Sequence, residues 1–135
     1  KQKLSSTIGI AHTRWAPHGE PNQINSHPHL DCSSKIAIAH NGIVENYHAL
    51  KELLESEGHK IVSDTDSEII AHLVEKFYQG DLEQAVTKAL ELIVGSYGLV
   101  VMHQDEEKII EIFTEIYTFI LNIIYFYNLF VLDYK

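Results

Sequence analysis

The 135-residue sequence predicts an α+β domain. Two observations lead to this prediction. Short β-branched runs occur near both ends of residues 7–112, and amphipathic helical patterns fill the region between them. Strands before and after a group of helices are typical of α+β or layered α/β domains. With 45% hydrophobic residues, the chain has enough apolar side chains for one hydrophobic core.

The first predicted strands are short and rich in isoleucine. Residues 7–11 (Thr-Ile-Gly-Ile-Ala) predict a buried strand, and residues 35–40 predict another, in which isoleucines alternate with small residues. Asn41 and Gly42 follow directly. Because both residue types tolerate positive φ, they predict a turn that ends the second strand.

Three amphipathic helices are predicted in the middle of the chain, because apolar residues recur there on one helical face. A capping-box pattern, Thr65 with Glu68 three residues later, marks the start of the second helix. Asp81 is predicted to cap the third, and glycines that follow the first two are stop signals. The predicted elements are a helix at 45–57 ended by Gly58, a strand at 60–63, a helix from Thr65 to Gly80, and a helix at 82–94.

A hairpin is predicted after the helices. A turn at residues 96–98 leads into a strand at 99–102, and polar residues 104–107 form a hairpin turn into a strand at 108–112. These two runs complete the strand–helix–strand order on which the fold class rests.

The last segment differs in character from the rest of the chain. Residues 116–132 carry no charge, and 17 such residues are the lower bound for a membrane span. However, Asn122 and Asn128 lie inside the segment, and no basic flank precedes it. Three interpretations stay open: a shifted reading frame or chance extension, a genuine buried segment, and a membrane anchor. We predict a domain at residues 1–112 and an atypical apolar tail at 113–135.

Charge and cysteine content restrict the possible partners and compartments. A net charge of -9 disfavours a nucleic-acid partner, because a phosphate backbone requires a basic face. No apolar signal-peptide region follows the first residues and there is no initial Met, so we expect the sequence to begin part-way through a longer one. The single cysteine, Cys32, excludes an intramolecular disulfide and is compatible with a reducing compartment. We therefore expect a cytoplasmic protein with no nucleic-acid partner and no membrane partner.

Residues 12–29 concentrate Arg, Trp, His, Pro and Gly in one predicted loop. Arg14 offers a planar fork to a carboxylate, Trp15 offers a rigid wall, and the prolines stiffen the segment. This composition predicts a binding loop for a small anionic or zwitterionic ligand. A surface turn with solvated side chains is the alternative.

Neither a metal site nor a cofactor site is predicted. His27-Pro28-His29 lies on a loop without converging cysteine ligands, which disfavours zinc. The sequence contains no phosphate-binding or dinucleotide-binding fingerprint. Cys32 and His40 could form a thiol nucleophile and its base, but no oxyanion donors adjoin Cys32 in the sequence, so an incidental thiol is the better interpretation.

Asn41-Gly42 and Asp66 each allow a functional and a structural interpretation. The side-chain amide of Asn41 and the backbone N–H of Gly42 are two donors that could point at one oxygen, as in an oxyanion hole. Asp66 could receive the ammonium group of a ligand or stabilise a helix N-terminus. Spacing alone favours the structural interpretation in both cases: a plain turn and a helix cap.

Four motifs follow one another along the chain between His12 and Glu68. Together they resemble the glutamine amidotransferase domain of the glutamine–fructose-6-phosphate aminotransferase (isomerising) family, the glucosamine-6-phosphate synthases. The resemblance covers about Ser5 to Ile112. It implies a partial four-layer αββα sandwich of the N-terminal nucleophile hydrolase type, without the opening strand and the closing part. The motifs are His12-Thr13-Arg14-Trp15-Ala16-x-His18-Gly19-Glu20-Pro21, Asn25-x-His27-Pro28-His29, His40-Asn41-Gly42-Ile43-Val44-Glu45-Asn46 and Asp64-Thr65-Asp66-Ser67-Glu68.

The resemblance also implies a reaction and a set of site residues. In that family an N-terminal cysteine attacks the side-chain amide of glutamine. The ammonia released serves a separate sugar-isomerase half, which converts fructose 6-phosphate to glucosamine 6-phosphate in a homo-oligomeric enzyme. The implied roles are Arg14 for the α-carboxylate of glutamine, Trp15 closing over the site, His18 lining the pocket, Asn41 and Gly42 as the oxyanion hole, and Asp66 for the ammonium group.

This sequence departs from the family pattern at its start, at Pro17 and after about Ile112. The family's N-terminal Cys and its opening strand are absent from this sequence, and Cys32 has no free α-amine, so the isolated chain is expected to be inactive. Pro17 stands where the family usually has Thr, which removes a hydroxyl and a backbone donor from the loop. Two alternatives stay open: a non-catalytic amino-acid-binding or interaction module, and another class II glutamine amidotransferase.

Overall fold

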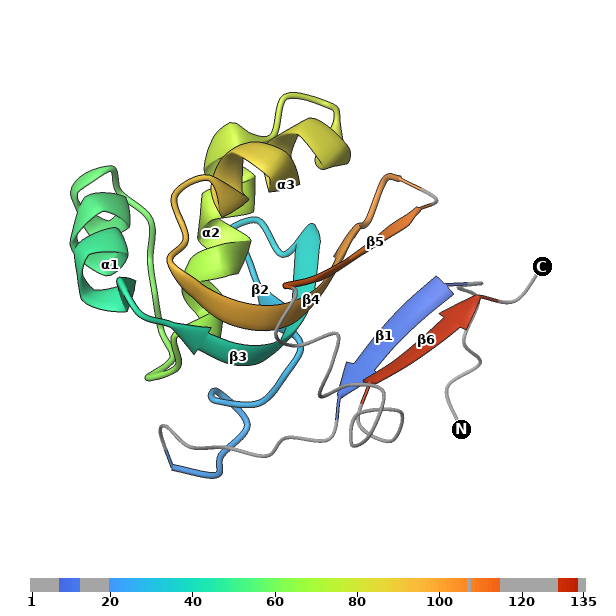
Figure 1. Cartoon of the computed structure of the whole chain (residues 1–135), viewed down its shortest axis with the longest axis horizontal. Helices are drawn as coiled ribbons and strands as arrows, with labels where there is room; N and C mark the ends of the chain where they lie inside the picture. Colours follow the sequence, from blue (N-terminus) through green and yellow to red (C-terminus); the bar gives the residue numbers. More distant parts are fainter. Residues whose placement is uncertain (1–7, 13–19, 107, 115–128, 134–135) are drawn as a thin grey trace.

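A computed structural model describes residues 8–12, 20–106, 108–114 and 129–133 of the chain (Figure 1). Helices are grouped in the middle of the sequence and strands lie on both sides of them, which confirms the α+β class. The elements are β1 (Ile8–His12), β2 (His29–Leu30), β3 (Ile36–Val44), α1 (Tyr47–Ser56), α2 (Ser67–Phe77), α3 (Leu82–Leu90), β4 (Gly95–His103), β5 (Ile109–Phe113) and β6 (Leu129–Asp133).

Two antiparallel sheets are formed. The larger has the order β2-β3-β4-β5, and the smaller pairs β1 with β6. The helices pack over the larger sheet, and the β1–β6 ribbon lies on the side away from them (Figure 1). The described residues therefore contain one helical layer, a sheet and part of a second sheet.

Strand β3 is longer than predicted, because it continues through Asn41 and Gly42 to Val44. The predicted turn at these two residues is wrong. Gly42 pairs with Tyr97 of β4 and has a φ of 144°. A Cβ added to Gly42 would lie 2.3 Å from the backbone oxygen of Ser96. Gly42 is therefore required by the close approach of two strands and not by a turn.

The strand that pairs with β3 is also longer than predicted. Strand β4 begins at Gly95, so the predicted turn at 96–98 is wrong as well. Helix α3 ends at Leu90, four residues before the predicted end. The side chain of Asn46 accepts from the N–H of Val94 and donates to the carbonyl oxygen of Leu92. These two hydrogen bonds hold the segment after α3 as a turn that leads into β4.

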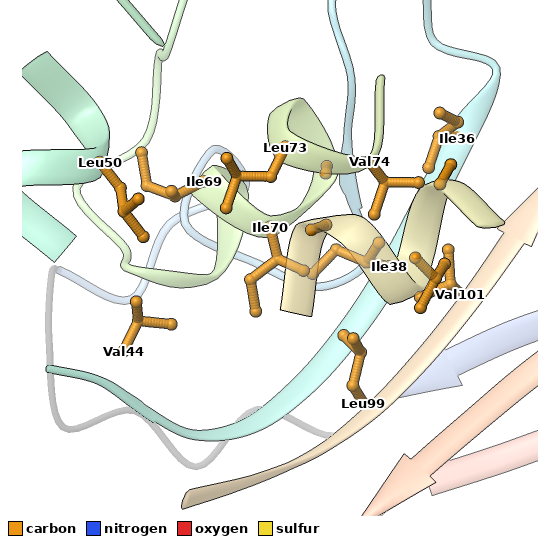
Figure 2. Packing of buried hydrophobic residues seen from close by; sticks show 14 of the residues in the cluster. Ile36, Ile38, Val44, Leu50, Ile69, Ile70, Leu73, Val74, Leu99 and Val101 are labelled. Carbon is orange, nitrogen blue, oxygen red and sulfur yellow. The ribbon is translucent and has the colours of Figure 1, made fainter. Parts of the chain in front are cut away.

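The core lies between the larger sheet and the helices (Figure 2). Ile38 of β3 and Leu99 of β4 are fully buried, and they pack in one cluster with Ile70 and Leu73 of α2. Full burial of one such side chain contributes roughly 1.5–3 kcal/mol. The cluster fixes α2 on β3, and these are the two elements that position the candidate site.

Of the four predicted helix signals, two are confirmed, the capping box is wrong, and α2 ends at Phe77, three residues before the predicted stop at Gly80. Asp81 caps α3 through the N–H of Gln84, and Gly58 follows α1 with a φ of 93°. The capping box before α2 does not form. The carboxylate of Glu68 instead accepts from the backbone N–H groups of Val62 and Ser63.

The hydrogen bonds of Glu68 also explain why the strand predicted at residues 60–63 does not form. Residues 60–63 form an irregular segment rather than a strand, and Val62 and Ser63 take the Glu68 carboxylate as their acceptor. Although burial raises the pKa of Glu68, hydrogen bonds from His72 and from these backbone groups lower it to about 2. Glu68 is therefore an anion that ties the connection between α1 and α2 to the helix.

Residues 113–114 and 129–133 of the atypical apolar tail fall within the described ranges, and Phe113 is the last residue of β5. Residues 129–133 form β6, which pairs antiparallel with β1, Ile10 opposite Val131. Residues 115–128 lie outside those ranges. Over the described part of the chain, no helix has the length and apolar character needed to cross a bilayer.

Candidate functional site

Three of the six predicted site residues are described, and the structure brings them to one end of β3. Asn41 and Gly42 lie on the strand, and Asp66 immediately precedes α2. The Asp66 Oδ2 atom accepts from the backbone N–H of Val44 at 2.8 Å. This bond joins the end of β3 to the start of α2, two segments that lie more than 20 positions apart in the sequence. Arg14, Trp15 and His18 lie outside the described residues.

The side chain of Asn41 is oriented by a histidine from the other sheet. Asn41 Oδ1 accepts from His12 Nε2 at 2.8 Å. Because the carbonyl oxygen of the amide is engaged, the Nδ2 group points the other way and its two protons remain for other acceptors. Burial lowers the pKa of His12, although its hydrogen bond to Asn41 opposes that shift. The imidazole is therefore neutral near pH 7 and donates through Nε2.

The backbone N–H of Gly42 lies on the side of β3 that faces away from β4. Alternate N–H groups along a strand point to opposite sides. The N–H of Glu45 bonds the β4 side, at Val94, and the N–H of Val44 bonds Asp66 on the other side. Gly42 is two residues from Val44 and shares its direction. Its N–H thus points to the same side of the strand as the Asp66 carboxylate.

Asp66 occupies the cap position of α2, but its side chain makes no capping hydrogen bond in the described structure. The carboxylate binds the β3 backbone instead. The side chain is half-buried, and the first turn of α2 follows it directly. A carboxylate at this place can bind β3 through one oxygen and present negative charge to a cation.

His40 reinforces the junction between β3 and α2, and sequence reasoning gave it no role there. Its Nδ1 atom is hydrogen-bonded to the hydroxyl of Ser67 at 2.8 Å, and both side chains are buried. Burial lowers the pKa of His40 to about 4, although the charge of Asp66 opposes the shift. His40 therefore remains neutral at physiological pH. Its position beside Asn41 in the motif was the available sequence signal.

The loop that precedes β2 is fastened to the residues before α2. Asn25 Oδ1 accepts from the backbone N–H of Asp64 at 2.9 Å, and Asn25 Nδ2 donates to the carbonyl oxygen of Glu20. His29 Nε2 is hydrogen-bonded to the hydroxyl of Thr65 at 3.0 Å. The bonds from Asn25 to Asp64 and from His29 to Thr65 hold this loop against the segment that precedes α2.

His27 and Cys32, candidates from the sequence for a metal site and a nucleophile, lie next to other histidines. The ring of His27 lies between those of His12 and His29, with centroid distances of 4.6 and 4.7 Å. The sulfur of Cys32 contacts His59 and His72 rather than forming the nucleophile–base pair considered with His40. His12, which had only been part of a motif, is the residue that orients Asn41.

Comparison with known proteins points to one family. A family model described as a glutamine amidotransferase domain matches residues 12–113. A glutamine–fructose-6-phosphate aminotransferase of Thermotoga maritima is 54% identical over 107 residues, which are 78% of this chain and 18% of that protein. The corresponding protein of Thermus thermophilus is 50% identical over 110 residues, 82% of this chain and 18% of the relative. The chain thus spans about a fifth of the length of these curated relatives.

Solved structures agree with this result. A glutamine phosphoribosylpyrophosphate amidotransferase from Bacillus subtilis has a TM-score of 0.58 and 27% identity, covering 69% of this chain and 20% of that one. A second structure, described as the allosteric regulatory enzyme of purine biosynthesis, has a TM-score of 0.59 and 26% identity, covering 70% and 21%. Both share the arrangement of strands and helices over about 70% of this chain.

Proposed function

Because the chain belongs to the glutamine amidotransferase domain family, we propose that it forms the glutamine pocket of a glutamine–fructose-6-phosphate aminotransferase (isomerising). One observation supports this proposal most directly. The Asp66 carboxylate is bound to β3 two residues from Gly42, on the side toward which the Gly42 N–H points. An anionic group and an oxyanion donor therefore belong to one surface, as binding of an amino acid with a reactive side-chain carbonyl requires.

The proposed pocket recognises both charges of the amino acid. Asp66 binds the α-ammonium group, and Arg14, the only arginine in the sequence, binds the α-carboxylate. Trp15 closes over the ligand and His18 lines the pocket. The roles of these last three residues rest on the motif that carries the resemblance.

The other end of the pocket stabilises the reaction. When a thiolate attacks the side-chain carbonyl carbon of glutamine, the carbonyl oxygen becomes an oxyanion. The Nδ2 group of Asn41 and the N–H of Gly42 donate to that oxygen. Collapse of the tetrahedral intermediate expels ammonia and leaves a thioester, which water then hydrolyses.

The family resemblance supplies the rest of the proposal. The attacking group is the family's N-terminal cysteine, because the Cys32 thiol lies among histidines and a glutamate outside this pocket. Ammonia passes to a sugar-isomerase part of the longer enzyme, which converts fructose 6-phosphate to glucosamine 6-phosphate. The enzyme is proposed to be a cytoplasmic homo-oligomer, as the resemblance implies. We propose that residues 1–112 contribute the amidotransferase fragment and that residues 113–135 are the atypical tail.

Binding of ligands that differ in one charge tests the pocket. Titration calorimetry on the 135-residue chain would compare L-glutamine with glutaramic acid, which lacks the α-ammonium group, and with glutamine α-amide, which lacks the α-carboxylate. We expect L-glutamine to bind at least about tenfold more tightly than either analogue, because each analogue loses a charge-assisted contact. Equal binding of all three compounds, or no binding of L-glutamine, would contradict the proposal.

A further inference from the structure

Four metal-binding side chains converge beside α2, outside the proposed glutamine pocket. Cys32 belongs to the turn between β2 and β3, His59 to the connection between α1 and α2, and His72 and Glu75 to α2 itself. One ligand atom from each residue lies within 4.8 Å of all the others. The donors come from three segments spread over 43 sequence positions, so the fold assembles the group.

The distances between four pairs of these donor atoms are close to those of a tetrahedral metal site. His72 Nδ1 lies 3.5 Å from Cys32 Sγ and 3.3 Å from Glu75 Oε2. His59 Nδ1 lies 3.8 Å from Cys32 Sγ and 2.9 Å from Glu75 Oε2. Bonds of about 2.0–2.3 Å to a tetrahedral zinc ion place neighbouring ligand atoms roughly 3.3–3.7 Å apart. Small adjustments would bring the four donors to these separations.

The orientation of His72 supports the same interpretation. Its Nδ1 atom faces the group, and its Nε2 atom lies 3.4 Å from the buried carboxylate of Glu68. A carboxylate on the far nitrogen of a histidine is the usual outer contact of a metal-bound imidazole, because it fixes the ring and raises its basicity. The side chain of His72 is only 1% exposed, which leaves its direction little freedom.

The surroundings of the sulfur also suit a cation. The backbone N–H of Lys60 donates to Cys32 Sγ, and such a donor stabilises a thiolate. The backbone N–H of Cys32 donates to Glu75 Oε2, which keeps the carboxylate beside the sulfur. The charge of a divalent ion would be compensated by the Cys32 thiolate and by Glu75.

We propose that Cys32, His59, His72 and Glu75 form a structural zinc site. One sulfur, two imidazole nitrogens and one carboxylate oxygen are a donor set that zinc accepts in tetrahedral geometry. All four positions are filled by protein ligands, which leaves none for a reacting water. The ion would link the turn before β3 and the connection before α2 to α2 itself.

The site is independent of the metal interpretation rejected from sequence. That interpretation concerned His27 and His29, whose rings contact each other and whose neighbours are other histidines and Thr65. The zinc site shares no ligand with the proposed glutamine pocket. Failure of one proposal therefore leaves the other standing.

Metal binding to the purified chain without a polyhistidine tag tests the inference. The chain would be loaded with zinc, passed through gel filtration in metal-free buffer and analysed for zinc by atomic emission. A parallel sample with Co²⁺ would be examined for the charge-transfer band of a cobalt–thiolate bond. We expect one metal ion per chain, a thiolate band, and at least about tenfold weaker zinc binding in Cys32→Ser.

Two further variants control the result. Cys32 is exposed, and circular dichroism would verify that Cys32→Ser keeps the fold. Glu75→Gln keeps the size of its side chain and is expected to weaken zinc binding in the same way. His48→Gln removes an exposed histidine outside the group and should retain one zinc ion. Absence of retained zinc, a cobalt spectrum without the thiolate band, or unchanged affinity in Cys32→Ser would overturn the proposal.

Discussion

His12 Nε2 donates a 2.8 Å hydrogen bond to Asn41 Oδ1, joining the β1–β6 ribbon to the larger sheet. The bond fixes the amide of Asn41 with its oxygen toward His12 and its Nδ2 donor directed away. An oxyanion hole needs a donor that is already oriented before the charge develops, because reorientation during the reaction would cost free energy. The contact between the two sheets thus serves the proposed chemistry and the packing together.

Asn41→Ala is predicted to affect turnover more than binding. In the longer enzyme that carries the family's N-terminal cysteine, loss of one oxyanion donor should lower kcat for glutamine hydrolysis by about 100- to 1,000-fold. The KM for glutamine should change little, since the donor acts on charge that appears in the transition state. Release of ammonia, followed in a coupled assay, measures both constants.

Asn46→Ala is the matched control for Asn41→Ala. Asn46 uses its amide to hold Leu92 and Val94, away from the proposed oxyanion hole. Its replacement should lower thermal stability and leave kcat within a few-fold of the unaltered enzyme. If Asn41→Ala retained full kcat, the oxyanion role of Asn41 would be wrong.

Gly42→Ala is predicted to destabilise the chain strongly. The φ of 144° is unfavourable for Ala, and the added Cβ would lie 2.3 Å from Ser96 O and 2.7 Å from Tyr97 Cα. Backbone strain of this kind costs about 1–3 kcal/mol, and the displacement of β4 adds to it. The free energy of unfolding, measured by urea denaturation, should fall accordingly.

Gly58→Ala separates the cost of backbone strain from the cost of displacing β4. Its φ is 93°, but a Cβ there would meet nothing within 4 Å. We expect a loss of about 1–2 kcal/mol, smaller than that for Gly42→Ala. Equal losses in the two variants would show that the approach of β4 to Gly42 is looser than the structure indicates.

The burial of neutral His40 predicts a dependence of stability on pH. The pKa of His40 is about 4 in the folded chain against 6.5 as its ordinary value. The unfolded chain therefore binds more protons between these values, and the free energy of unfolding falls as pH is lowered from about 6.5 to 4. The slope contributed by one such group approaches about 1.4 kcal/mol per pH unit.

Urea denaturation at several pH values measures that slope. His40→Gln should flatten the profile between pH 6.5 and 4, and His48→Gln, at an exposed position, should leave it as it is. Comparing the two variants removes the contribution of other titrating groups to the slope. Glu68 is one of these: because its pKa is lowered from 4.5 to about 2, the stability it contributes is lost only as pH falls below about 4.5. Identical profiles in the two variants would contradict the burial of a neutral His40.

Arg14→Ala is predicted to weaken glutamine binding. Loss of a charge-assisted contact to the α-carboxylate costs about 1.5–3 kcal/mol, roughly a ten- to hundredfold loss of affinity. Lys35→Ala serves as the control, because Lys35 pairs with Asp105 at the opposite end of β3. Calorimetry on both variants measures the effect, and unchanged affinity in Arg14→Ala would refute the carboxylate role.

The sequence predicts the order of the elements well, and its failures have local physical causes. The helices and the long-range strand order follow from apolar periodicity and terminal signals such as Asp81. The residue types of Asn41-Gly42 predict a turn, because both tolerate positive φ. The strand register shows that Gly42 is selected by the approach of β4, and a contact between residues 55 positions apart leaves no local trace.

The candidate site was accessible from sequence only through the resemblance. Spacing favoured a cap for Asp66, whereas the structure binds its side chain to Val44. Glu68 had the right position for a capping box, yet the irregular segment before α2 offered N–H groups that bind it instead. The orienting contact of His12 and the group around Cys32 join distant segments, so only the folded chain shows them.

The most direct test of the proposed pocket is the affinity of the chain for L-glutamine after Asp66→Asn. Asparagine keeps an oxygen that can accept from the Val44 N–H but removes the negative charge. The matched control, Asp64→Asn, removes the same charge from an exposed residue two positions away. Calorimetry should show at least about tenfold weaker binding in Asp66→Asn and unchanged binding in Asp64→Asn. Equal affinity in the two variants would contradict the assignment of Asp66 to the ammonium group and, with it, the glutamine pocket.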